Sequence, residues 1–242
     1  MIARLARGII LNTMAKKEEH RHELLENPEA LKEKLVGAEH WLERHPKIIV
    51  GIAAGILILV GGYFAFNYYK DNQNTLAQKE MFQAVYYFEA DSLERGLNGD
   101  GNNLGFLDII DEYGITDAAN LAHYYVGVSY LKQGKYELAR LYLSDFSSND
   151  LLIQARAYSL LGDAFMEEKK YDDAAKYYNK AANYKPNKYF SPGYLMKEAL
   201  AYEKLNQNDK ARETYDKIID EYWESSELQN ARKFKARLEP NS

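Results

Sequence analysis

The longest uncharged run of the chain extends over residues 48–69, between Lys47 and Lys70. As an α-helix rising about 1.5 Å per residue, this run would be about 33 Å long, enough to cross a hydrocarbon core of about 30 Å. Backbone groups in lipid must find partners within their own segment, so we predict a transmembrane helix over residues 48–69. The alternative is a buried helix of a soluble protein, but such helices are usually shorter and carry some charge.

The tail before this run, residues 1–47, is predicted to contain a second helix. Asn27 and Pro28 are typical of a helix start, and apolar residues recur at helical spacing from Pro28 to Arg44. Pro46 ends the pattern. This amphipathic helix lies on the membrane surface or forms a solvated linker, and both interpretations are open.

The start of the chain and the charges beside the span predict its orientation. Residues 1–11 lack the uninterrupted apolar run of a signal peptide, so no cleaved signal is expected, whether the chain starts at Met1 or at Met14. Lysine and arginine are more frequent before the span than after it, which predicts a cytoplasmic N-terminus. The residues counted are Lys32, Lys34, Arg44 and Lys47 before the span, and Lys70 and Lys79 after it.

The segment after the span, residues 70–242, repeats a pattern of small residues. Gly127, Gly162 and Ala199 follow one another at offsets of 35 and 37 residues, each with an aromatic residue three positions later and an alanine twelve positions later. The aromatic residues are Tyr130, Phe165 and Tyr202, and the alanines are Ala139, Ala174 and Ala211. Small residues at this spacing let two helices cross closely. The pattern resembles the tetratricopeptide repeat and predicts an all-α solenoid.

Flanking segments extend this array. Residues 76–93 and 104–113 are predicted to form a degenerate fourth helix pair, split by a loop over residues 98–103 in which Asn103 caps the second helix. This loop also resembles a calcium loop weakly, but an apolar residue stands where an oxygen ligand is required. Ser191 is expected to cap a helix begun by Pro192, and Ser226 with Gln229 to form a capping box for a last helix ending near Leu238. The fold class is therefore a transmembrane helix followed by about four helix pairs and a C-terminal capping helix.

Composition argues against catalysis. The sequence has no cysteine, and its five histidines are not spaced as metal ligands. Phosphate loops and nucleophile motifs are also absent. A formal net charge of −5 disfavours nucleic-acid binding. We therefore expect an interaction protein, with no catalytic residue, cofactor or metal.

The binding surface is predicted from the first helix of each pair, which lines the concave face of such arrays. The inward positions are Leu121, Tyr124, Val128, Leu131, Ser159, Asp163, Met166, Met196, Leu200 and Glu203. This set is largely apolar and contains adaptable methionines, which favours extended or unfolded apolar segments over a charged C-terminal tail. For each residue the alternative is packing against the adjacent repeat.

A short tail, one uncleaved span and an exported array of tetratricopeptide-like pairs together resemble the YfgM family, ancillary subunits of the bacterial SecYEG translocon. The resemblance covers the architecture of nearly the whole chain, with motifs of the generic repeat. It implies a single-pass inner-membrane protein whose periplasmic domain, beside the translocon, binds nascent or unfolded envelope proteins or recruits a periplasmic chaperone.

Two alternatives remain open. A scaffold of another envelope assembly or secretion machine would share every feature and differ only in its partner. A cytosol-facing receptor of the organelle-import type would invert the topology, which the lysine and arginine balance opposes.

Overall fold

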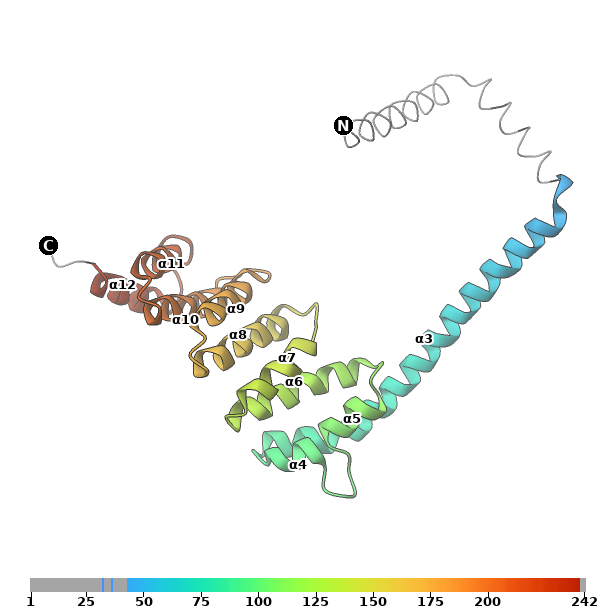
Figure 1. The fold of residues 1–242 in the computed structure, drawn as a ribbon, viewed down its shortest axis with the longest axis horizontal. Helices are drawn as coiled ribbons and strands as arrows, with labels where there is room; N and C mark the ends of the chain where they lie inside the picture. The colour runs from blue at the N-terminus through green and yellow to red at the C-terminus, as the bar shows by residue number, and fades with distance from the viewer. Residues whose placement is uncertain (1–31, 33–35, 37–42, 240–242) are drawn as a thin grey trace, which may run out of the picture. The chain divides into compact units, whose positions relative to one another are not determined.

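The computed structural model describes residues 32, 36 and 43–239, and the chain falls into two compact units, residues 1–67 and 68–242. Every regular element among the described residues is an α-helix (Figure 1). The all-α prediction is confirmed. Most of the amphipathic helix predicted over Pro28–Arg44 lies outside the described residues; Glu43 and Arg44 are helical, and His45 is not.

The described part of the first unit is dominated by the beginning of helix α3, which extends over Pro46–Glu89. The side chains of residues 50–66 are all exposed. This helix is long and apolar enough to cross a membrane. The prediction that residues 48–69 are helical is confirmed.

The second unit begins inside α3, because the helix continues to Glu89. The prediction of a separate helix over residues 76–93 is therefore wrong. Neither proline nor glycine occurs between Asn67 and Glu89, so nothing in the sequence interrupts the backbone hydrogen bonds of the helix. Ala77, Met81 and Ala84 share one buried stripe of this part of α3 and belong to the same hydrophobic cluster as Phe106.

Two short helices follow, α4 (Leu93–Asn98) and α5 (Phe106–Glu112). Asp100, not Asn103, organises the loop between them: its carboxylate accepts from the backbone N–H groups of Asn102 and Asn103 at 2.9 and 2.7 Å. The predicted Asn103 cap is therefore wrong. At the start of α5, the Gly105 N–H instead donates a hydrogen bond of 2.9 Å to the Asp108 carboxylate.

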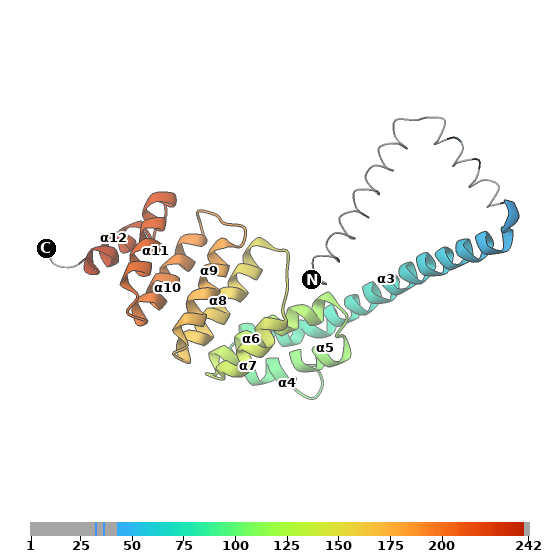
Figure 2. The same cartoon turned by 45° about the horizontal axis from the view of Figure 1, so that its top comes forward.

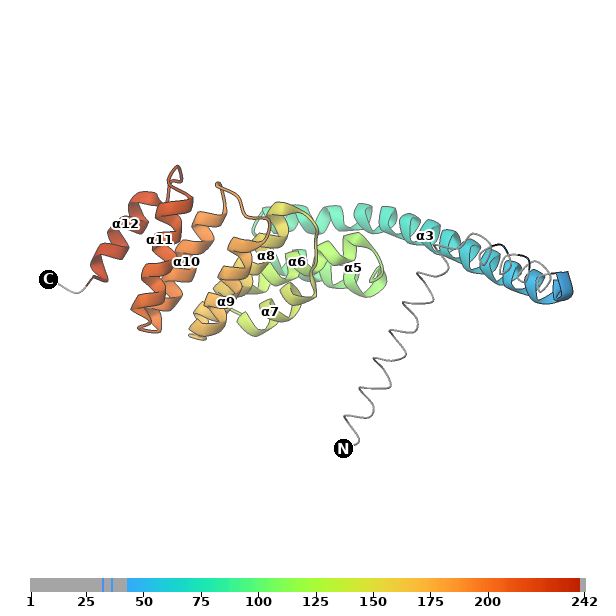
Figure 3. The same ribbon diagram turned by 90° about the horizontal axis from the view of Figure 1, so that it is seen from above.

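Three helix pairs and a last helix complete the second unit (Figure 2). The pairs are α6 (Asp117–Lys132) with α7 (Tyr136–Asp145), α8 (Leu151–Glu167) with α9 (Tyr171–Asn183), and α10 (Ser191–Lys204) with α11 (Asn208–Glu221), followed by α12 (Leu228–Arg237). Successive helices from α8 to α11 lie side by side (Figures 2 and 3).

The small residues of the repeat lie where the two helices of a pair cross. A Cβ added to Gly127 would lie 2.5 Å from Cγ of Leu143, and one added to Gly162 would lie 2.6 Å from Cε1 of Tyr178. The corresponding alanine of the third pair, Ala199, is completely buried. The predicted solenoid is confirmed, together with the pairing of these positions.

Two predicted helix caps are wrong. Ser191 lies inside α10, where its hydroxyl donates to the Ala182 carbonyl at 2.8 Å; the chain before the helix is held by Asn187, whose side-chain oxygen accepts from the Phe190 N–H. Ser226 makes no cap, because α12 begins at Leu228, although the helix ends next to Leu238 as predicted.

Candidate functional site

A pocket of about 340 Å³ lies between α8 and α10, the first helices of two successive pairs. We call it the α8–α10 pocket; its lining residues are Leu152, Arg156, Ser159, Leu160, Asp163, Phe190, Tyr194 and Lys197. The α8 residues recur every three or four positions, which places them along one stripe of that helix. The α10 side contributes two aromatic rings and one lysine.

Lys197 and Asp163 bridge the two helices inside this pocket. The Lys197 ammonium lies 2.9 Å from both carboxylate oxygens of Asp163 and 3.2 Å from Oγ of Ser159. The same carboxylate accepts from the Tyr178 hydroxyl of α9 at 2.7 Å. Burial, followed by the negative charge of Asp163, raises the pKa of Tyr178. Tyr178 therefore stays neutral, and Asp163 is fixed by two side chains, Lys197 and Tyr178.

Arg156 connects this pocket to α6. Burial raises the pKa of Tyr124 on α6, and the positive charge of Arg156 opposes that rise. Tyr194 on α10 shows the same two influences in the same order. One arginine therefore interacts with tyrosines of both neighbouring helices, so α6, α8 and α10 present a common face.

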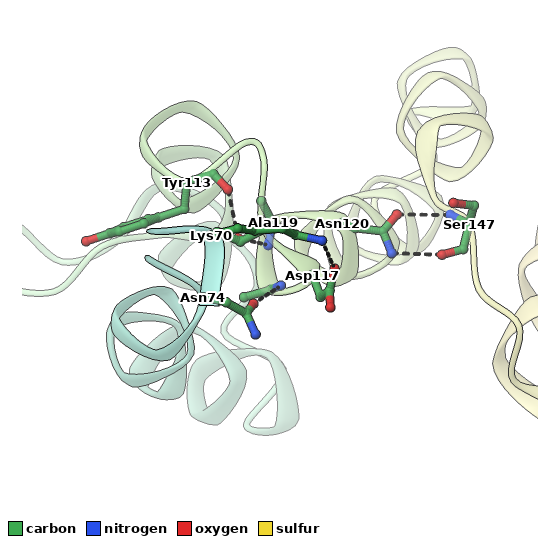
Figure 4. A network of polar contacts seen from close by, with 9 residues as sticks. Lys70, Asn74, Tyr113, Asp117, Ala119, Asn120 and Ser147 are labelled. Atoms are coloured by element: carbon green, nitrogen blue, oxygen red, sulfur yellow. Dashed lines mark hydrogen bonds and ion pairs between the residues drawn. The ribbon is translucent and has the colours of Figure 1, made fainter. Parts of the chain in front are cut away.

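A second pocket, of about 490 Å³, lies between the beginning of α6, the loop before α8 and the beginning of α8. Its lining residues are Asp117, Asn120, Leu121, Phe146, Ser147, Ser148, Asn149 and Ile153, and we call it the α6–α8 pocket. Asn120 fixes its wall by donating to the Ser147 carbonyl at 2.8 Å and accepting from the Ser147 N–H at 3.0 Å (Figure 4).

Residues 127–189 and 194–225 each match a model of the tetratricopeptide repeat. The repeats are tetratricopeptide repeats. The matched ranges begin at Gly127 and cover the crossing residues of all three pairs. No curated protein matches the chain at significant similarity. Tetratricopeptide repeats form protein–protein interaction modules, so the α6–α8–α10 face is the candidate partner site.

The structure places the predicted groove residues in four settings. Ser159 and Asp163 line the α8–α10 pocket, and Leu121 lines the α6–α8 pocket. The residues that pack in or against the hydrophobic clusters of the repeats are Leu121, Tyr124, Val128, Met166 and Met196. Leu131 is half-buried, and Leu200 is 37% exposed. Glu203 accepts from the Tyr215 hydroxyl at 2.6 Å and pairs with Arg237. Their role in partner binding remains a prediction.

Sequence reasoning missed Arg156, Tyr194 and Lys197. Arg156 could have been found, because it stands three positions before Ser159 on the same stripe of α8. Tyr194 and Lys197 lie on the side of α10 that faces α8. The repeat spacing does not specify which side of a helix lines a pocket with its neighbour. With these residues the pocket is more polar than the predicted apolar groove.

This arrangement is suited to binding a polypeptide. Within residues 43–239 no group of three or more His, Cys, Asp or Glu side chains is arranged to hold a metal ion. The pocket offers aromatic surface from Phe190 and Tyr194 beside fixed donors and acceptors. An extended polypeptide could place one side chain in each pocket while its backbone follows the face.

Proposed function

We propose that the chain is a single-pass membrane protein whose tetratricopeptide repeat domain binds extended protein segments. The observation that supports membrane anchoring is the uncharged run over residues 48–69 within α3, whose side chains are nearly all exposed in the described part of the chain. Exposed apolar surface of that extent requires a nonpolar environment. We infer a cytoplasmic N-terminus and a domain on the opposite side of the membrane from the lysine and arginine balance.

The two pockets support binding of an extended segment. Helix α8 contributes to both, and both are lined by side chains held in place by hydrogen bonds. Tyr194 supplies rigid apolar contact, while Arg156 and the Lys197–Asp163 pair supply polar contacts. We therefore expect ligands that alternate apolar and polar side chains, rather than uniformly apolar ones.

At the finest level we propose an accessory role at the Sec translocon, where the domain would receive emerging envelope proteins or recruit chaperones. The support is the resemblance of the whole architecture to the YfgM family. A scaffold of another envelope assembly or secretion machine is the second candidate, and it requires the same anchor and the same face.

Crosslinking in cells tests this function. A photo-activatable phenylalanine analogue at Tyr194 should capture partners, whereas the same analogue at Lys210, exposed on α11, should not. Translocon subunits and nascent envelope proteins among the products would support the Sec proposal. A different envelope complex would move the function to the second candidate, and equal capture at both positions would refute the proposed face.

The orientation is tested with a chain that has no natural cysteine. Lys204→Cys, at the exposed end of α10, should react with a membrane-impermeant maleimide once the outer membrane is permeabilised. Ala15→Cys, in the N-terminal tail and present whether the chain starts at Met1 or at Met14, should react only after lysis. The opposite labelling pattern would support the cytosol-facing topology.

A further inference from the structure

The repeat domain has two edges made of connecting segments. The loop edge consists of the segments that lead into α6, α8, α10 and α12: residues 113–116, 146–150, 184–190 and 222–227. The turn edge consists of three-residue segments at the other end of the helices: residues 90–92, 133–135, 168–170 and 205–207. The two edges differ sharply in composition.

Large apolar side chains are exposed along the loop edge. Tyr189 is 74% exposed and Trp223 is 64% exposed. The connecting segments of this edge also expose Ile115 and Phe190. In the first turn after a connecting segment, Leu151 and Leu152 are exposed at the loop edge and Leu138 at the turn edge. None of the exposed large apolar residues lies in a connecting segment of the turn edge. Most residues of these segments carry a charged or an amide side chain. Core packing cannot account for this difference, because the side chains concerned are outside the core.

The loops of this edge are joined into one surface. Asn120, in the first turn of α6, makes two hydrogen bonds with Ser147. The Tyr184 hydroxyl donates to the Ser148 carbonyl at 2.9 Å, and Lys188 lies 3.2 Å from Glu224. The apolar residues are therefore held on a continuous band rather than on independent loops.

Helix α3 enters the domain at this same edge. The Lys70 ammonium lies 2.9 Å from the Asp117 carboxylate at the start of α6, and the Asn74 side chain accepts from the Ala118 N–H at 2.9 Å (Figure 4). At the opposite end, Asp91 pairs with Lys132 at 2.8 Å. Residues 70–89 therefore run parallel to α6 from the loop edge to the turn edge, and the uncharged run ends one residue before Lys70.

We propose that the part of the loop edge formed by residues 222–227 and the neighbouring Tyr189 rests on the lipid bilayer that residues 48–69 cross, with Trp223 and Tyr189 in its headgroup layer. This inference relies on the membrane anchoring proposed above. Indole and phenol rings favour that layer because one end is apolar and the other is hydrated. The turn edge, which lacks such residues, faces away from the membrane.

The charges of the loop edge define how it binds lipid. The acids Asp117, Asp150, Glu224 and Glu227 outnumber the lysines Lys70, Lys185 and Lys188 at this edge. Attraction to anionic lipids therefore contributes little to the contact between the loop edge and the bilayer, which depends on insertion of apolar side chains. The contact should persist in high salt and on zwitterionic vesicles.

Quenching by brominated lipids tests the contact with the full-length chain. Trp41→Phe leaves Trp223 as the single tryptophan. In phosphatidylcholine vesicles brominated near the headgroup, its emission should fall at least about twofold further than that of a turn-edge control. The control carries Trp41→Phe, Trp223→Phe and Lys204→Trp.

Flotation of both variants with the vesicles separates the two proposals. If neither variant floats, the anchoring proposal fails and this inference fails with it. If both float but Trp223 is quenched no more than the control, anchoring stands and the lipid contact is refuted. A third outcome is that Trp223 is not quenched in vesicles but is shielded from acrylamide in native membranes. That result would refute the lipid contact and assign the edge to a protein partner.

Discussion

Gly162 lies at the crossing of α8 and α9, where Tyr178 fills the space that a side chain would need. A Cβ added at Gly162 would lie 2.6 Å from Cε1 and 2.7 Å from Cδ1 of the Tyr178 ring. The ring is 3% exposed, and its hydroxyl donates to Asp163 at 2.7 Å. Because the ring is enclosed and bonded, it cannot move away without breaking the link to the α8–α10 pocket.

Gly162→Leu should therefore destabilise the domain. Overpacking of this kind costs about 1–3 kcal/mol, and four added carbons against a fixed ring favour the upper end. Replacing a helical glycine recovers about 1 kcal/mol of helix propensity. The net loss is about 2 kcal/mol, which lowers the unfolding midpoint of a domain of this size by about 4–8 °C.

Thermal unfolding of the full chain in detergent, followed by the emission of Trp223 in a Trp41→Phe background, measures this loss. Gly193→Leu is the matched control, because an added Cβ there meets only a carboxylate oxygen of Glu227, at 3.9 Å. Its midpoint should stay the same or rise, because no overpacking offsets the gain in helix propensity. Equal midpoints for the two variants would refute the helix crossing at Gly162.

A second substitution tests the cause of the loss. Tyr178→Leu removes the ring that meets the new side chain, so its effect in the Gly162→Leu background should be smaller than in the wild type. A coupling of about 1 kcal/mol or more is expected for residues in contact. Strict additivity would show that the destabilisation arises elsewhere.

Two further predictions concern buried and capping groups. Burial raises the pKa of Glu198 above its usual value of 4.5, so the folded state holds the proton more readily and stability falls as pH rises from 4.5 toward neutrality. At pH 7.5, Glu198→Gln should increase the free energy of unfolding by about 1 kcal/mol and so raise the unfolding midpoint. It should also make stability less dependent on pH. Glu213→Gln, at an exposed position, should change neither quantity. Asn74→Ala removes the acceptor for a backbone N–H at the start of α6 and should cost about 1 kcal/mol in urea unfolding, against no change for exposed Asn72→Ala.

The fold of the repeats was predictable because close helix crossings tolerate few residue types. Gly127, Gly162 and Ala199 show the register directly, since any larger side chain would separate the paired helices. The length of α3 was not predictable in the same way. The polar residues after Tyr69 resemble a linker in composition, and only burial of Ala77 and Met81 against the following helices shows that they continue the helix.

Helix starts were less predictable than helix crossings. Ser191 and Ser226 have the right residue type for caps, but each hydroxyl bonds elsewhere, to the Ala182 carbonyl and to the Glu227 carboxylate. Local sequence offers several acceptors near each helix start. Which one is used depends on the path of the preceding loop, which is determined by contacts with the next repeat.

The candidate site shows the same limit on a larger scale. Repeat spacing correctly identifies positions on a first helix, such as Ser159 and Asp163, because one helix defines their direction. A pocket between two helices also needs side chains from the neighbouring helix. Which side of that helix faces the pocket depends on how far the second repeat is rotated against the first. Tyr194 and Lys197 reach the α8–α10 pocket through this rotation. The ligand preference of the domain therefore depends on the packing of neighbouring repeats, and substitutions at helix crossings such as Gly162 should alter binding at Tyr194 even though they do not touch the ligand.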